Sequence, residues 1–231
     1  MVYIKVVGKI LSQAAENGDV ELVRIIINSG MNVNLRSEDK FTPLIQAAMN
    51  NHTLTVKSLI EFGANLDLQN EYNDTALHWA AMNNKTEMGK MLSNAGADVN
   101  LQNSYGGSAL FYAVENNNLE LVKMLVEKGA HVNVVENDGR TPLFFAAAWN
   151  HAEVALFLVE NGAEVNIANK DGSTPLHFAV HFDGVEVAKV LVQHGAHINV
   201  RDDNGKTPLG FALYTNNLQV FTYLNSIGGT E

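Results

Sequence analysis

The stretch TPLHFAVHFDGVEVAKVLVQHGAHIN, residues 174–199, decides the fold of this 231-residue chain. Its features return along the sequence every 33 residues, and a fixed period of this length is typical of repeat architectures. Three series of residues keep the same phase over nearly the whole chain. They are Gly30, Gly63, Gly96, Gly129, Gly162, Gly195 and Gly228; Thr42, Thr75, Ser108, Thr141, Thr174 and Thr207; and Leu44, Leu77, Leu110, Leu143, Leu176 and Leu209. Chance does not produce three series in phase, so the chain is predicted to be an array of similar units.

Each series has a physical role in a helical unit. A threonine such as Thr174 can cap the free N–H groups of a helix, and proline is tolerated in the first turn that follows. The periodic leucine points into the core. Asparagine recurs at the predicted end of this first helix, where a left-handed conformation is needed, as at Asn150. A second amphipathic helix follows, for example 119–127, and then a polar turn such as 133–139.

This pattern closely resembles the ankyrin repeat. Thr174-Pro175-Leu176-His177 reproduces the signature tetrapeptide of that family, and Gly195-Ala196-His197-Ile198-Asn199 its terminal loop. The resemblance implies an all-α repeat solenoid of stacked helix-turn-helix units with hairpin-like loops. The chain is predicted to form a single domain, 1–231. Its units are approximately 1–35 (N-terminal cap), 36–68, 69–101, 102–134, 135–167, 168–200 and 201–231 (C-terminal cap).

The two terminal units depart from the repeated pattern. Polar Ser12 and Gln13 lie in the first unit, where later units have larger or more apolar groups. Asn225 replaces the apolar residue that most units have at its position. Polar outer faces on terminal units keep a solenoid soluble, so both ends are predicted to be caps.

The amino-acid composition excludes several classes of function. The chain has no cysteine, which excludes disulfides and a cysteine nucleophile. The formal charge of −10 is the opposite of what nucleic-acid binding needs, and it suits a partner protein with a basic patch. No apolar run is long enough for a membrane span, and no secretory signal is evident. A cytoplasmic monomer without a cofactor is expected.

No residue pattern indicates catalysis. His177 and His181 lie four apart on a predicted helix, a spacing that could hold a metal, but the carboxylate of the metalloprotease pattern is missing. The resemblance instead implies a structural hydrogen bond for His177 and for its counterpart His78. There is neither a phosphate-binding glycine loop nor a nucleophile elbow. We therefore expect no enzyme and no metal site.

The resemblance places partner binding on hairpin tips and on the exposed face of each first helix, which together line a concave groove. The residues mapped there are mainly aromatic or methionine, and acidic groups border them. Such residues are enriched at the centres of interfaces. The predicted partner-binding residues are Phe41, Met49, Tyr72, Met82, Tyr105, Glu115, Asp138, Trp149, Asp171, Phe182 and Tyr214.

Several readings of this surface remain open. Aromatic residues also fill the cores of repeat proteins, and Trp79, Tyr112, Phe145 and Phe178 are predicted at inner positions. The leading hypothesis is a protein-binding module that acts as an adaptor or an inhibitor. A second is a reader of lysine or methyl-lysine peptides, in which Trp149, Phe182 and Tyr214 form an aromatic cage. A toxin-neutralising or effector-type binding protein is a third.

Overall fold

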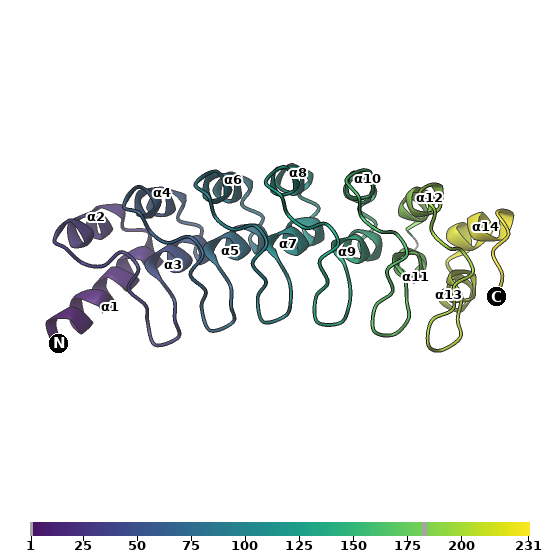
Figure 1. Ribbon diagram of the computed structural model, residues 1–231, viewed down its shortest axis with the longest axis horizontal. Coiled ribbons are helices and arrows are strands. Elements are labelled where there is room, and N and C mark those ends of the chain that lie inside the picture. The colour runs from purple at the N-terminus through teal and green to yellow at the C-terminus, as the bar shows by residue number, and fades with distance from the viewer. Residues whose placement is uncertain (1, 182–183) are drawn as a thin grey trace. The chain divides into compact units, whose positions relative to one another are not determined.

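The computed structural model describes residues 2–181 and 184–231, and every regular element within them is an α-helix (Figure 1). The chain divides into two compact units. Unit 1 comprises Met1–Tyr112 and Glu127–Gly129, and unit 2 comprises Ala113–Val126 and Ala130–Glu231. Each unit is built from repeated pairs of helices, as the sequence period predicts.

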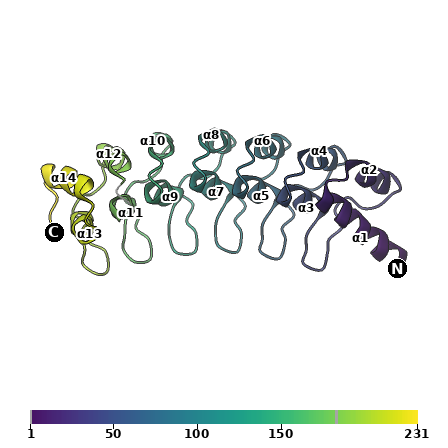
Figure 2. The ribbon, with the colours of Figure 1, turned by 180° about the vertical axis from the view of Figure 1, so that it is seen from behind.

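Unit 1 contains the first three helix pairs and the beginning of a fourth. Its inner helices pack side by side, α1 on α3 and α3 on α5, and its outer helices form a second row, α2 on α4 and α4 on α6 (Figure 2). Hairpin-like loops extend away from the helices on one side. The elements are α1 (Val2–Asn17), α2 (Val20–Asn28), α3 (Pro43–Met49), α4 (Thr53–Glu61), α5 (Ala76–Met82), α6 (Thr86–Asn94) and the first residues of α7 (Ala109–Glu115).

Unit 2 repeats the same arrangement. The inner helix α9 packs on α11 and α11 on α13, while the outer helix α10 packs on α12 and α12 on α14. The elements are the end of α7, α8 (Leu119–Glu127), α9 (Pro142–Ala148), α10 (Ala152–Glu160), α11 (Pro175–His181), α12 (Val185–Gln193), α13 (Pro208–Thr215) and α14 (Leu218–Ser226). The fold class predicted from the sequence is therefore confirmed.

Among the periodic threonines, Thr42, Thr75 and Thr207 cap their inner helices and Thr141 does not. The Thr42 hydroxyl oxygen accepts from the N–H of Ile45 at 3.2 Å, and Thr75 and Thr207 act in the same way in their own repeats. Thr141 makes no such bond, because the Phe144 N–H donates to the Thr141 backbone oxygen, and the buried Thr141 Oγ1 has no partner. The role expected for this series is thus wrong at Thr141.

The inner helices end as predicted. Five asparagines of the described part follow these helices with positive φ, between 53° and 64°, in the left-handed region. They are Asn51, Asn84, Asn117, Asn150 and Asn216. Asparagine tolerates this region better than other non-glycine residues, so the chain can turn sharply into the outer helix.

The core is made by the periodic leucines and by the small residues beside them. Leu110, Leu143 and Leu176 are completely buried, and Ala80 and Ala146 let neighbouring inner helices approach closely. Two buried histidines connect successive repeats. His78 Nε2 lies 3.1 Å from the Gly107 carbonyl oxygen, and His177 Nε2 lies 3.1 Å from that of Lys206. The structural role that the resemblance implies for these histidines is confirmed.

Helix α1 is longer than the other inner helices. It has 16 residues, whereas the others have seven or eight. Gln13 and Asn225, the polar residues that mark the terminal units, are exposed, and so are Ile10 and Leu213 of the same units.

Candidate functional site

The hairpins owe their shape to one side chain at the start of each tip. In unit 1, the Asn70 amide oxygen accepts from the N–H groups of Tyr72 and Asp74, at 2.9 and 2.8 Å. The Asn70 N–H in turn donates to the Asp74 carbonyl at 3.0 Å. Neighbouring tips also bond to each other, since the Ser104 N–H donates to the Tyr72 carbonyl at 2.8 Å. Side chains on the tips are thereby held at fixed positions.

Unit 1 presents two tyrosines on neighbouring tips. Tyr72 is 49% exposed and Tyr105 is 64% exposed. The pKa of Tyr72 is raised, chiefly by the negative charge of Glu71 and by a hydrogen bond to it, with smaller effects of burial, Tyr105 and Asp39. Both tyrosines are thus accessible to a partner, and Glu71 is the acidic group that acts most strongly on Tyr72.

The other predicted residues of unit 1 are less accessible. Phe41, Met49 and Met82 are half-buried. The backbone carbonyl of Met49 accepts from the Asn83 side-chain amide at 2.9 Å, which ties the end of α3 to the end of α5. These three side chains therefore offer less exposed surface than the two tyrosines.

Unit 2 presents aromatic residues at the ends of its inner helices. Trp149, which follows α9, is 54% exposed, and Tyr214 near the end of α13 is 76% exposed. Phe182 lies outside the described residues. Lys206 Nζ lies 4.0 Å from the centre of the Tyr214 ring and 5.2 Å from that of Phe211. The chain's own lysine thus takes the place over Tyr214 that a ligand would need in the predicted aromatic cage.

The acidic residues of unit 2 are partly neutralised within the hairpin. Glu115, Asp138 and Asp171 are exposed. Arg140 reaches back to Glu136 Oε1 at 3.0 Å and to Asp138 Oδ2 at 2.9 Å. Burial alone would raise the pKa of Glu136, but hydrogen bonds from Arg140 and the backbone hold that pKa below its usual value.

A protein-family model described as ankyrin repeats (3 copies) matches residues 11–103, 95–169 and 161–229. The chain belongs to the ankyrin repeat family. No curated protein matches the chain significantly as a relative. Ankyrin repeats are general protein–protein interaction modules, and members of the family are typically non-enzymatic scaffolds.

A series of aromatic residues on the inner helices of these ankyrin repeats is more accessible than predicted. It comprises Trp79, Tyr112, Phe145, Phe178 and Phe211, spaced 33 residues apart and each half-buried. Four of them, all except Phe211, were predicted to fill the core, and this prediction was only partly right because their side chains are half-buried. A sequence signal for their accessibility was present. The residue five positions before the ring is charged in three of the repeats, at Asp74, Arg140 and Lys206.

The histidine that the sequence singled out has both ring nitrogens engaged. His177 Nδ1 lies 3.0 Å from the Thr174 hydroxyl and 3.1 Å from its backbone nitrogen, while Nε2 faces the Lys206 carbonyl. Burial lowers the pKa of His177. Throughout the described residues, no group of three or more histidine or carboxylate side chains lies close enough to hold a metal.

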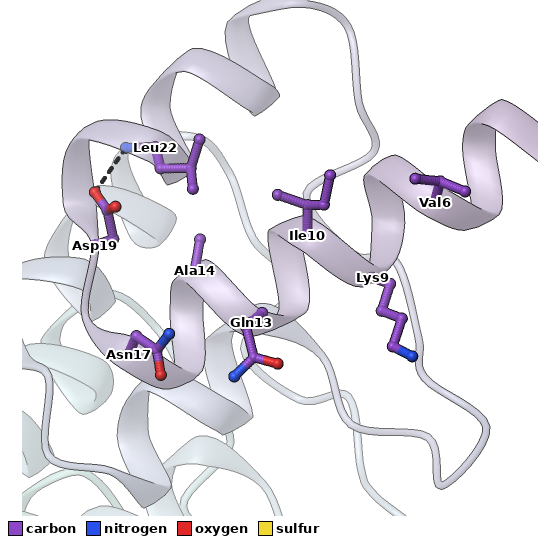
Figure 3. Close-up of a pocket in the computed structure, with 8 residues that line it drawn as sticks. All are labelled: Val6, Lys9, Ile10, Gln13, Ala14, Asn17, Asp19 and Leu22. Carbon is purple, nitrogen blue, oxygen red and sulfur yellow. Dashed lines mark hydrogen bonds between the residues drawn. The ribbon is translucent and has the colours of Figure 1, made fainter.

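A pocket of about 390 Å³ opens on helices α1 and α2 of the first ankyrin repeat (Figure 3). Its lining is mainly apolar, with Ile10 and Leu22 projecting toward the space, and Lys9 and Asp19 at its edges. No hairpin-tip residue lines it. None of the predicted binding residues lines it. Among the described helices, none combines the length and the apolar composition needed to cross a membrane.

Proposed function

We propose that this ankyrin repeat protein binds a partner protein through a hairpin face, which we define within each unit as the hairpin tips together with the C-terminal ends of the inner helices. The observation that carries the proposal is the exposure of Tyr72 and Tyr105 on neighbouring tips of unit 1. Exposed aromatic groups that gather on a rigid support are typical of interaction sites. A preorganised surface of this kind loses little conformational entropy on binding.

Charge on the hairpin face favours a partner with a basic patch. Glu71 and Asp39 lie close enough to Tyr72 to raise its pKa, and Asp138 and Asp171 are exposed on the tips of unit 2. Acidic groups around an aromatic centre steer a basic partner toward the surface and disfavour acidic ones. An adaptor and an inhibitor would use the same chemistry.

The alternative of a methyl-lysine reader on the later repeats receives no support from the side chains described. Lys206 already stacks on Tyr214, and a ligand would have to displace it. Displacement would expose the charge of Lys206 and forfeit a cation–π contact before any contact with the ligand was gained. We therefore favour partner binding by exposed aromatic side chains over recognition in a cage.

Affinity capture with mass spectrometry tests the proposal. The wild type is compared with Tyr72→Ala/Tyr105→Ala and with the control Leu54→Ala. Leu54 is 74% exposed on the outer helix α4 of the same unit, so its removal deletes a similarly accessible apolar group from another face. We expect a partner that the control retains and the tyrosine variant loses. Equal retention by the two variants would show that the hairpin face of unit 1 is not the binding surface.

A further inference from the structure

Unit 2 covers two of its inner-helix aromatic rings with its own cations. The Arg140 guanidinium carbon lies 5.2 Å from the centre of the Phe145 ring, and Lys206 Nζ lies 5.2 Å from that of Phe211. In both repeats the cation immediately precedes the periodic threonine, and the ring follows five residues after the cation. In both repeats, the cation before the threonine therefore lies over the aromatic ring that follows five residues later.

In unit 1 the same position of the Trp79 repeat carries the opposite charge. Asp74 stands where Arg140 stands relative to Phe145, and Asn70 takes the place of Glu136. The cation that covers the ring in unit 2 is thus replaced by a carboxylate in the repeat that has the largest ring of the series. Tryptophan is also the aromatic side chain that attracts cations most strongly.

Asp74 lacks a cationic partner in the described part of the chain. The residue is only 4% exposed, and the side-chain amide of Asn103 donates to Oδ1 at 2.8 Å. The same amide nitrogen lies 2.6 Å from the Tyr112 hydroxyl. No described salt bridge involves Asp74. Carboxylates this deeply buried are usually paired, so Asp74 is prepared for a cation that the chain does not provide.

The aromatic ring five residues later in this repeat, that of Trp79, is not anchored by a hydrogen bond. Trp79 Nε1 is buried without a hydrogen-bond partner in the structure, and Trp79 itself is half-buried. Buried indole N–H groups normally have a partner. Since no such bond holds the indole, the ring can adjust its position without breaking a hydrogen bond.

We propose that an arginine side chain of a partner protein lies over Trp79 beside Asp74, in the place that Arg140 takes over Phe145 in unit 2. This inference rests on the proposed function and specifies the chemistry of the partner. Arginine fits better than lysine, because its planar guanidinium stacks on an indole and pairs with a carboxylate at the same time. The neighbouring tips with Tyr72 and Tyr105 would contact the residues that flank this arginine.

The test uses the fluorescence of Trp79 in the full-length chain. The sequence has two tryptophans, so Trp149→Phe leaves Trp79 as the only one. In this background the probe is a capped peptide of alternating arginine and glycine, and the matched neutral peptide has citrulline in place of arginine. We expect a saturable change in Trp79 emission with the arginine peptide and none with the citrulline peptide.

Two variants and one control locate the site. Asp74→Asn keeps the hydrogen-bond acceptor for Asn103 and should weaken peptide binding about tenfold. Asp74→Arg should place the chain's own guanidinium over Trp79 and abolish the response. Glu21→Gln removes the same charge from exposed Glu21 on outer helix α2 and should leave the affinity unchanged. Thermal melting of each variant checks that the fold is retained, and Asp74→Asn decides alone if Asp74→Arg does not fold.

The result that overturns the proposal is equal weakening by Asp74→Asn and Glu21→Gln, which would indicate attraction by net charge alone. Absence of a saturable change in the Trp149→Phe protein would also overturn it. The capture experiment with the tyrosine variants remains independent. A partner lost from Tyr72→Ala/Tyr105→Ala but retained by Asp74→Asn would support the proposed function and refute the arginine site. The converse outcome would refute the proposed surface and retain the site.

Discussion

Individual histidines join one repeat to the next. The backbone N–H of Thr75 donates to His78 Nδ1 at 3.2 Å, so the ring proton is on Nε2, which donates to the Gly107 carbonyl. The neutral ring therefore satisfies one group in its own repeat and one in the following repeat. Burial lowers the pKa of His78 from 6.5, and the nearby charge of Asp74 opposes this only in part.

The protein should consequently lose stability in mild acid. A histidine whose pKa is lower in the folded state stays neutral there, while the unfolded chain takes up a proton as the pH falls below about 6.5. Protonation thus favours the unfolded state. We expect the melting temperature to fall between about pH 7.5 and pH 5.5, and His78→Gln to reduce this pH dependence. The exposed His197 provides the control His197→Gln, whose slope against pH should match the wild type. An unchanged slope for His78→Gln would contradict the assignment.

Among the inner helices, the same Thr-Pro motif contributes differently to stability in different repeats. Thr42 and Thr141 occupy the same position before a proline, and both are buried. Only Thr42 caps its helix, because at Thr141 the helix begins with a tighter backbone bond from Phe144. The sequence pattern is the same in both repeats and therefore could not distinguish them.

Replacement of each threonine by valine should separate the two cases. Thr42→Val removes a cap and leaves the Ile45 N–H unsatisfied, which should cost about 1 kcal/mol. Thr141→Val replaces a buried hydroxyl that has no partner, so its stability should equal or exceed that of the wild type. Urea unfolding followed by circular dichroism measures both free energies. A larger loss for Thr141→Val than for Thr42→Val would show that the cap assignments are wrong.

For the helices and hairpins, the sequence predicted the features that recur from repeat to repeat and missed those that occur in one repeat only. The 33-residue period gave the helix pairs, the asparagine turns and the hairpins, since each depends on local residue types. The length of α1 could not be predicted from the period, because residues 2–9 lie before the position at which the other inner helices begin. Nor could the stacking of Lys206 on Tyr214, which depends on how a flexible side chain folds over α13. Trp79 and Asp74 were overlooked as a pair because the aromatic series was interpreted as core.

For the molecule as a whole, the formal charge of −10 should act on binding kinetics more than on complex lifetime. Asp138 and Asp171 are exposed on hairpin tips of unit 2. For a basic partner identified by capture, Asp138→Lys/Asp171→Lys should slow association about tenfold and reduce its salt dependence. Reversal of two outer-helix charges, Glu153→Lys with Glu186→Lys, makes the same change in net charge elsewhere. Stopped-flow mixing at several salt concentrations compares them, and identical rates for the two double variants would contradict a role for the tips.

The backbone hydrogen bond between neighbouring hairpins of unit 1 also sets the spacing at which a bound peptide would meet the side chains of the tips. Ser104 N–H to Tyr72 carbonyl fixes one tip against the next, and neighbouring helices that carry such tips are spaced about 10 Å apart. An extended polypeptide advances about 3.3 Å per residue, so three of its residues span one repeat. A segment lying along the tips in extended form would therefore meet Tyr72 and Tyr105 with residues three apart, and the two residues between them would be free to vary. Ligands of unit 1 would then share a triplet spacing rather than a contiguous motif.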